Sequence, residues 1–132
     1  MRSAAELDAR IHTFCDLVPH LAIDGPRRFL LSAIHERRPS AYDGWERRAG
    51  IYIFEQGGVV QYVGRAMWRK GLLRRIEDHC LPRGDKVWDD VWTKPDTTVG
   101  VVALPEADWY WAGALEPYLI THCAPPFNKR VC

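Results

Sequence analysis

The chain has 132 residues, of which 47% are hydrophobic and 27% are charged, with a net charge of +1. This length is enough for one compact core and too short for two ordinary domains. No apolar run approaches the roughly 20 residues that a membrane helix needs, so we expect a soluble protein without a membrane partner. Acids occur early and no long apolar stretch follows the first methionine, which argues against a signal peptide and favours a cytoplasmic protein.

The first 48 residues are expected to form a helical extension that packs on the same domain as the rest. Between residues 3 and 18, apolar side chains recur at helical spacing. A second helix is predicted to start near Asp24, with Pro26 in its first turn. Residues 37 to 48 lack periodicity and are predicted to be a polar connector. An amphipathic helix docks on a partner as readily as on its own domain, so residues 1 to 48 could instead recruit another protein or pair two copies.

The remainder, residues 49 to 132, alternates between strand and helix patterns. β-Branched and aromatic residues flank a glycine turn, which predicts a β-hairpin. The expected elements are strands over 51–54, 59–63 and 98–104, helices over 67–80 and 106–122, and a short amphipathic turn over 87–92. These predict an α+β fold, a small, mainly antiparallel three-stranded sheet flanked by helices and preceded by the two N-terminal helices.

A cluster of basic residues occupies one short stretch after the hairpin. Between Gly64 and Ile76 there are five basic residues and no acid. They would give one element a locally positive face, which indicates a polyanionic partner more than the small net charge does. The candidate nucleic-acid-binding residues are Arg65, Arg69, Lys70 and Arg74.

Two short triplets frame the predicted hairpin. Gly50-Ile51-Tyr52 opens its first strand, and Tyr62-Val63-Gly64 closes the second. On the following helix, Arg75 and His79 are four residues apart and therefore share one face. Glu116 stands on the closing helix, and Asn128 follows Pro126 and Phe127.

In this order, the residues resemble the pattern of the GIY-YIG nuclease family, with valine in place of the usual isoleucine of the second triplet. The resemblance covers residues 49 to 132. It implies DNA strand cleavage with a divalent metal and a catalytic set of Tyr52, Tyr62, Arg75, His79 and Asn128, with Glu116 as the metal ligand. The segment before Arg75 is longer than the family's common form, so Arg69 or Arg74 could take the role given to Arg75.

The chemistry of phosphodiester hydrolysis suits the same residues. Glu116 is a hard oxygen ligand for Mg²⁺ or Mn²⁺, and Mg²⁺ often takes only one or two protein carboxylates. Arg75 can donate two hydrogen bonds to a phosphate oxygen pair, and its charge is permanent. Tyr52 could orient or deprotonate water if His79 relieves it of its proton. Pro117 removes a helical hydrogen bond next to Glu116 and is expected to kink the helix there.

A shared site for Tyr52 and Tyr62 requires both phenols on one face of the hairpin. A two-residue turn at 57–58 would set Tyr52 opposite Val63 and separate the phenols, whereas a three-residue loop over 56–58 sets Tyr52 opposite Tyr62. We therefore predict the three-residue loop, with a glycine at positive φ.

A catalytically silent nucleic-acid-binding module of the same fold is the alternative to an endonuclease. Double-stranded DNA is the expected partner ahead of RNA. No separate DNA-reading module is visible, so specificity must come from residues 1 to 48, from the tryptophan-bearing segment 85–95 or from a partner. Oligomeric state and biological pathway stay open.

Overall fold

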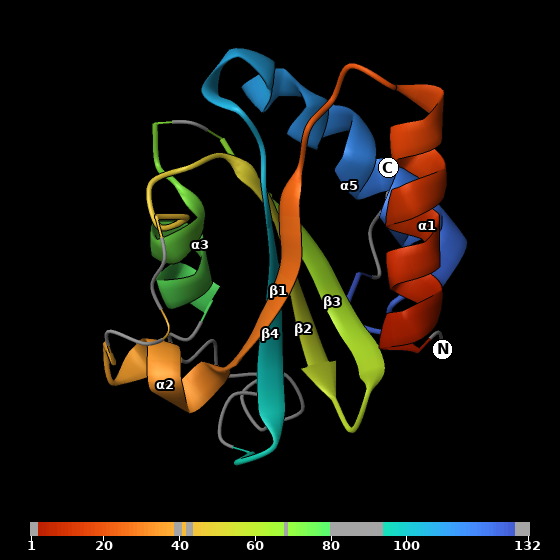
Figure 1. The fold of residues 1–132 in the computed structure, drawn as a ribbon. Helices are drawn as coiled ribbons and strands as arrows, with labels where there is room; N and C mark the ends of the chain where they lie inside the picture. Colours follow the sequence, from red (N-terminus) through yellow and green to blue (C-terminus); the bar gives the residue numbers. More distant parts are fainter. Residues whose placement is uncertain (1–2, 39–40, 42–43, 68, 80–93, 129–132) are drawn as a thin grey trace.

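The computed structural model describes residues 3–38, 41, 44–67, 69–79 and 94–128. Its centre is a four-stranded antiparallel sheet in the order β1-β4-β2-β3, which confirms the predicted α+β class. The strands are β1 (Asp24–Leu30), β2 (Gly50–Gln56), β3 (Val59–Ala66) and β4 (Thr97–Ala103). Helices α1 (Ala4–Leu17) and α5 (Ala112–Cys123) lie on one side of the sheet, and α2 (Leu31–His35) and α3 (Leu72–His79) lie on the other (Figure 1). None of the described helices is long and apolar enough to cross a membrane.

Each face of the sheet carries its own apolar core, because strand β2 is buried on both sides. Its alternate residues point to opposite faces. Ile51 and Ile53 pack with α1 and α5, whereas Tyr52 and Phe54 pack with α2 and α3. The residues of the first triplet are therefore divided between the two cores.

The prediction of a second N-terminal helix that starts near Asp24 is wrong. Residues 24–30 form strand β1, which pairs antiparallel with β4, and the helix that follows has only five residues. Proline is tolerated here because β1 is an edge strand whose register shifts between Asp24 and Arg27. The polar strand is held by Arg28, whose guanidinium bonds Asp8 of α1 at 2.7 Å and the buried Glu55 of β2 at 2.8 Å. The sheet consequently has four strands instead of three.

The hairpin turn also differs from the prediction, although its consequence holds. Gly57 and Gly58 form a two-residue turn, with φ of 56° and 76°, and Gln56 pairs with Val59. A register shift then skips Gln61, so that Tyr62 pairs with Phe54. This β-bulge turns the Tyr62 side chain to the face of Tyr52. The two phenols share a face because of the bulge and not because of a longer loop.

Both predicted helices of the second half begin later than expected. Helix α3 starts at Leu72, after Gly71 at φ 82°. The closing segment is a 3-10 helix, η2 (Glu106–Trp111), with non-helical angles at Asp108, followed by α5. The predicted amphipathic turn over 87–92 and most of the tryptophan-bearing segment 85–95 lie outside the described residues.

Candidate active site at the edge of the sheet

A buried tyrosine and a buried histidine form the centre of the candidate site. Tyr52 on β2 is 0% exposed and His79, the last residue of α3, is 4% exposed. The Tyr52 Oη and His79 Nε2 atoms are 2.6 Å apart, with donor and acceptor roles that depend on the histidine tautomer. The rings of Tyr62 and Phe54 flank the imidazole, with centroid distances of 4.9 Å and 6.0 Å. This aromatic enclosure fixes the orientation of the pair.

The glycine of the second triplet leaves space for the Tyr52 side chain. Gly64 lies directly opposite Tyr52 in the β2-β3 register. A Cβ atom at Gly64 would come within 2.2 Å of Tyr52 Cζ and 2.4 Å of Tyr52 Oη. The phenol therefore lies across β3 in the space of the missing side chain. The glycine within the triplet was the sequence signal for this contact, but the function of that glycine was not inferred from the sequence.

Gly50 of the first triplet is required by a different close approach. Its Cβ would meet the carbonyl oxygen of Val102 on β4 at 1.9 Å. The two glycines thus have separate packing reasons, one against neighbouring backbone and one against the candidate catalytic phenol.

Tyr52 is held as a neutral phenol. Burial raises the pKa of Tyr52 far above its ordinary value, and the neighbouring Tyr62 raises it further. Arg75 opposes this shift through its charge and a hydrogen bond to the phenol. The structure thus brings Arg75 to Tyr52, whereas Arg69 and Arg74 are exposed.

Glu116 reaches the same region from the opposite face of the sheet. Its side chain on α5 is 20% exposed, and its Oε1 lies 3.7 Å from Arg65 Nη1. Burial raises the pKa of Glu116, while the charges of Arg65 and Arg75 and a hydrogen bond with the Arg65 backbone lower it in part. Helix α5 continues through Pro117 to Cys123, so the proline does not end the helix at Glu116.

The donor set around Glu116 suits a hard, hydrated cation. Within the part of the chain that the structure describes, no three His, Cys, Asp or Glu side chains gather as a metal cluster. A single carboxylate is enough for Mg²⁺ because this ion keeps several of its waters. The partly buried carboxylate of Glu116, whose charge acts on Tyr52 and whose pKa is raised by burial and lowered in part by Arg75, is consistent with such a ligand.

The Asn128 side chain forms hydrogen bonds with the backbone of the edge strand β3. Its Oδ1 accepts from the Val63 N–H and its Nδ2 donates to the Val63 carbonyl, both at 2.8 Å. The Phe127 N–H donates to the Gln61 carbonyl at 3.1 Å. The amide therefore secures β3 between Tyr62 and Gly64, which positions both of these residues.

Two of the four predicted nucleic-acid-binding residues, Arg65 and Lys70, line a cleft together with Arg75. This cleft of about 240 Å³ is lined by Arg65, Met67, Lys70 and Arg75. Lys70 Nζ lies 2.7 Å from Asp78 Oδ2, while Arg65 pairs with Glu116. Both cations thus face a carboxylate as well as the cleft.

Comparisons with known proteins place the fold. No protein-family model and no curated protein matches the chain. Solved structures match, among them the GIY-YIG N-terminal endonuclease domain of UvrC from Thermotoga maritima, as a tyrosine-to-phenylalanine point mutant bound to its catalytic divalent cation. It is 26% identical, with a TM-score of 0.52 over 74% of this chain and 96% of that one. A second tyrosine-to-phenylalanine mutant of that domain, also bound to the catalytic divalent cation, is 25% identical, with a TM-score of 0.52 and the same 74% and 96% coverage. The resemblance found in the sequence is confirmed, because the chain has the fold of the GIY-YIG endonuclease domain.

Proposed function

We propose that the chain is a metal-dependent endonuclease that hydrolyses phosphodiester bonds in DNA. The observation that carries the proposal is the buried 2.6 Å contact between Tyr52 Oη and His79 Nε2, and Arg75 lies close enough to lower in part the raised pKa of the same phenol. Glu116 reaches the same strand edge from the second core. Similarity in fold to an endonuclease domain that binds a catalytic divalent cation supports this assignment.

Tyr52 and His79 are proposed to work as a proton relay. The raised pKa of Tyr52 argues against a standing phenolate at neutral pH. As water attacks phosphorus, its proton passes to Tyr52 Oη, and the phenol proton passes to His79 Nε2. Tyr52 then remains neutral before and after the transfer, and the imidazole carries the positive charge. Tyr62 lines the imidazole and restricts its orientation.

Arg75 and Glu116 are proposed to stabilise the charge on the phosphate, one directly and one through a metal ion. The guanidinium of Arg75 would donate to non-bridging oxygens and stabilise the charge that grows on them in the transition state. Glu116 would hold Mg²⁺ or Mn²⁺, and a bound cation supplies further positive charge at the phosphate. Arg65 neutralises part of the Glu116 charge and lies where it could also contact the DNA backbone.

The test is cleavage of supercoiled plasmid by the purified chain, with Mg²⁺ or with EDTA. Wild type should nick the plasmid only with the metal, and Glu116→Ala and Glu116→Gln should fail while retaining DNA binding. Glu36→Ala is the matched control, because Glu36 is an exposed carboxylate in an ion pair with Arg38. If the wild type binds DNA at low salt without cutting it under any metal condition, the silent binding module is the correct reading.

A further inference from the structure

A second cavity, outside the catalytic set, opens between the segment before β2 and the 3-10 helix η2. Its volume is about 280 Å³, and it is lined by Arg47, Arg48, Ala49, Leu104, Glu106 and Trp109. We propose that it binds one unpaired nucleotide of the DNA substrate, with the base against the Trp109 ring and the phosphate at Arg47. This inference rests on the proposed function, because it specifies the substrate as DNA with an unpaired base beside the cleaved strand.

The two arginines of the cavity have different tasks. Arg48 is committed to the protein, since its Nε donates to the Leu104 carbonyl at 3.2 Å and its Nη1 lies 3.2 Å from Asp24 Oδ2. Arg47 is exposed and makes no hydrogen bond or ion pair with any residue that the structure describes. Arg48 therefore has a structural role in the lining of the cavity, whereas the guanidinium of Arg47 could bind a ligand phosphate.

The rest of the lining suits a base better than a bare anion. Trp109 is partly buried and its ring is held edge-on by Tyr110 at a centroid distance of 6.1 Å. An indole can stack on any of the four bases, because every base has an aromatic face. Glu106 would repel an isolated phosphate but would accept hydrogen bonds from the amino edge of a base. The small volume fits a single base, since sites for larger ligands span roughly 300–1,000 Å³.

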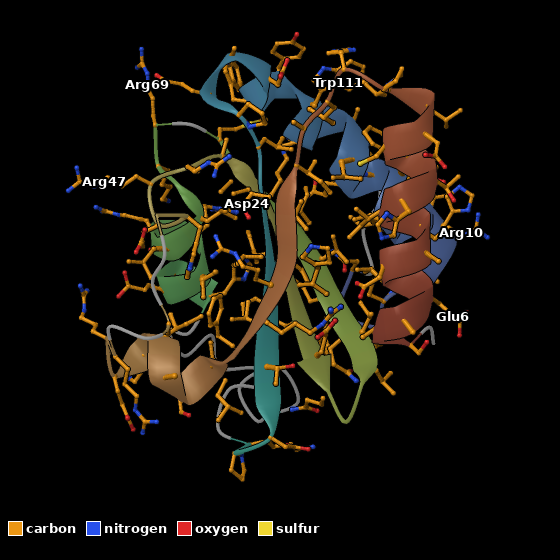
Figure 2. The ribbon with its side chains drawn as sticks, viewed as in Figure 1. Glu6, Arg10, Asp24, Arg47, Arg69 and Trp111 are labelled. Carbon is orange, nitrogen blue, oxygen red and sulfur yellow. The ribbon has the colours of Figure 1, made fainter. Side chains whose placement is uncertain are left out.

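The cavity is joined to the candidate active site through the start of α3. The Leu72 and Leu73 N–H groups donate to the carbonyls of Arg48 and Glu46, each at 3.0 Å. A Cβ atom at Gly71 would lie 2.9 Å from Arg47 Cα. Arg75 follows one turn later on the same helix, so a single strand could pass from Arg75 over this turn to Arg47. Figure 2 shows Arg47 and Arg69 projecting from the α3 side of the molecule, and Arg10 from the opposite side.

The test measures binding in EDTA, where the proposed chemistry is off. The full chain is titrated into a short labelled duplex, either fully paired or carrying one bulged 2-aminopurine. Wild type should bind the bulged duplex about fivefold or more tightly and quench the 2-aminopurine. Trp109→Leu, which keeps apolar bulk without a stacking face, should lose both effects, and Trp109→Phe should retain them. Leu17→Ala is the control for the loss of an exposed apolar side chain, because Leu17 is 71% exposed and does not line the cavity.

The charge is tested separately. Arg47→Ala should weaken binding and lower the salt slope by about one unit, whereas Arg10→Ala on the opposite side should leave the slope unchanged. Equal wild-type affinity for the two duplexes, or a bulge preference that survives in Trp109→Leu, would overturn the inference. Plasmid cleavage with Mg²⁺ but without a bulge preference would refute nucleotide binding in the cavity and support the endonuclease function. A bulge preference without cleavage would support nucleotide binding in the cavity and refute the endonuclease function.

Discussion

Replacing Gly64 with alanine tests whether the motif glycine serves Tyr52. The new methyl group would lie 2.2 Å from Tyr52 Cζ, so either the ring or strand β3 must move. Overpacking of this kind costs about 1–3 kcal/mol, and a lost hydrogen bond between Tyr52 and His79 leaves buried polar atoms at a cost of about 1–3 kcal/mol more. We expect Gly64→Ala to lose about 2–6 kcal/mol of stability in urea denaturation. Any folded fraction should cleave at least about 100-fold more slowly, because the phenol is displaced by ångströms.

Gly100→Ala is the matched control for that substitution. Gly100 lies on β4 of the same sheet, and a Cβ there would find its nearest neighbour at an ordinary 3.5 Å, on Ile53. Its urea midpoint should stay close to wild type. In a Tyr52→Ala background, Gly64→Ala should cost little, because the ring that it strikes is gone. If Gly64→Ala unfolds at the wild-type urea concentration and cleaves at the wild-type rate, the close approach of Tyr52 is not the reason for a glycine at this position.

Three further predictions concern individual side chains. The folded pKa of Tyr52 is raised above the unfolded value of 10.0, so its stabilising contribution is complete below pH 10 and is lost at higher pH. Wild type should therefore lose about 1.4 kcal/mol per pH unit more than Tyr52→Phe in urea titrations between about pH 10 and 12. Arg75→Ala should lose most of the turnover number in plasmid cleavage, whereas Arg69→Ala should weaken DNA binding and lower its salt slope by about one unit. If both variants show the same defect in DNA binding and no other defect, Arg75 belongs to the DNA-contacting surface and not to the catalytic centre. Asn128→Ala removes both hydrogen bonds to Val63 and should cost about 1–3 kcal/mol in urea denaturation, whereas an unchanged midpoint would show that β3 does not depend on this amide.

The sequence predicted well those helices and strands whose formation depends on signals within the segment itself. Helix α1 and the hairpin strands combine a regular apolar pattern with a clear start or turn signal. Strand β1 was missed because Asp24 and Pro26 imitate a helix start, while the stabilising partners of Arg28 lie on α1 and β2. No local pattern records such distant pairing.

The composition of the candidate site could be predicted, but its assembly could not. The triplets and the helical spacing of Arg75 and His79 predicted a set of residues, of which the structure brings Tyr52, Arg75 and His79 together. The β-bulge at Gln61 depends on pairing with β2, so the turn sequence alone gave the wrong loop for Tyr62. The cavity at Trp109 joins two segments that are distant in the sequence, 47–49 and 104–109, and no single motif indicated it.

The position of the site at the strand edge follows from the two-core design. Tyr52 and His79 belong to the core under α3, whereas Glu116 is carried by α5 on the opposite face. A continuous sheet would separate groups on its two faces, and only an edge strand lets them meet around its side. Gly64 has no side chain to block that passage, so the Tyr52 phenol extends across β3 until the charge of Glu116 contributes to its pKa. Since α1 packs on α5 in the core that does not contain Tyr52, changes in the N-terminal helix should displace Glu116 more than the Tyr52-His79 pair.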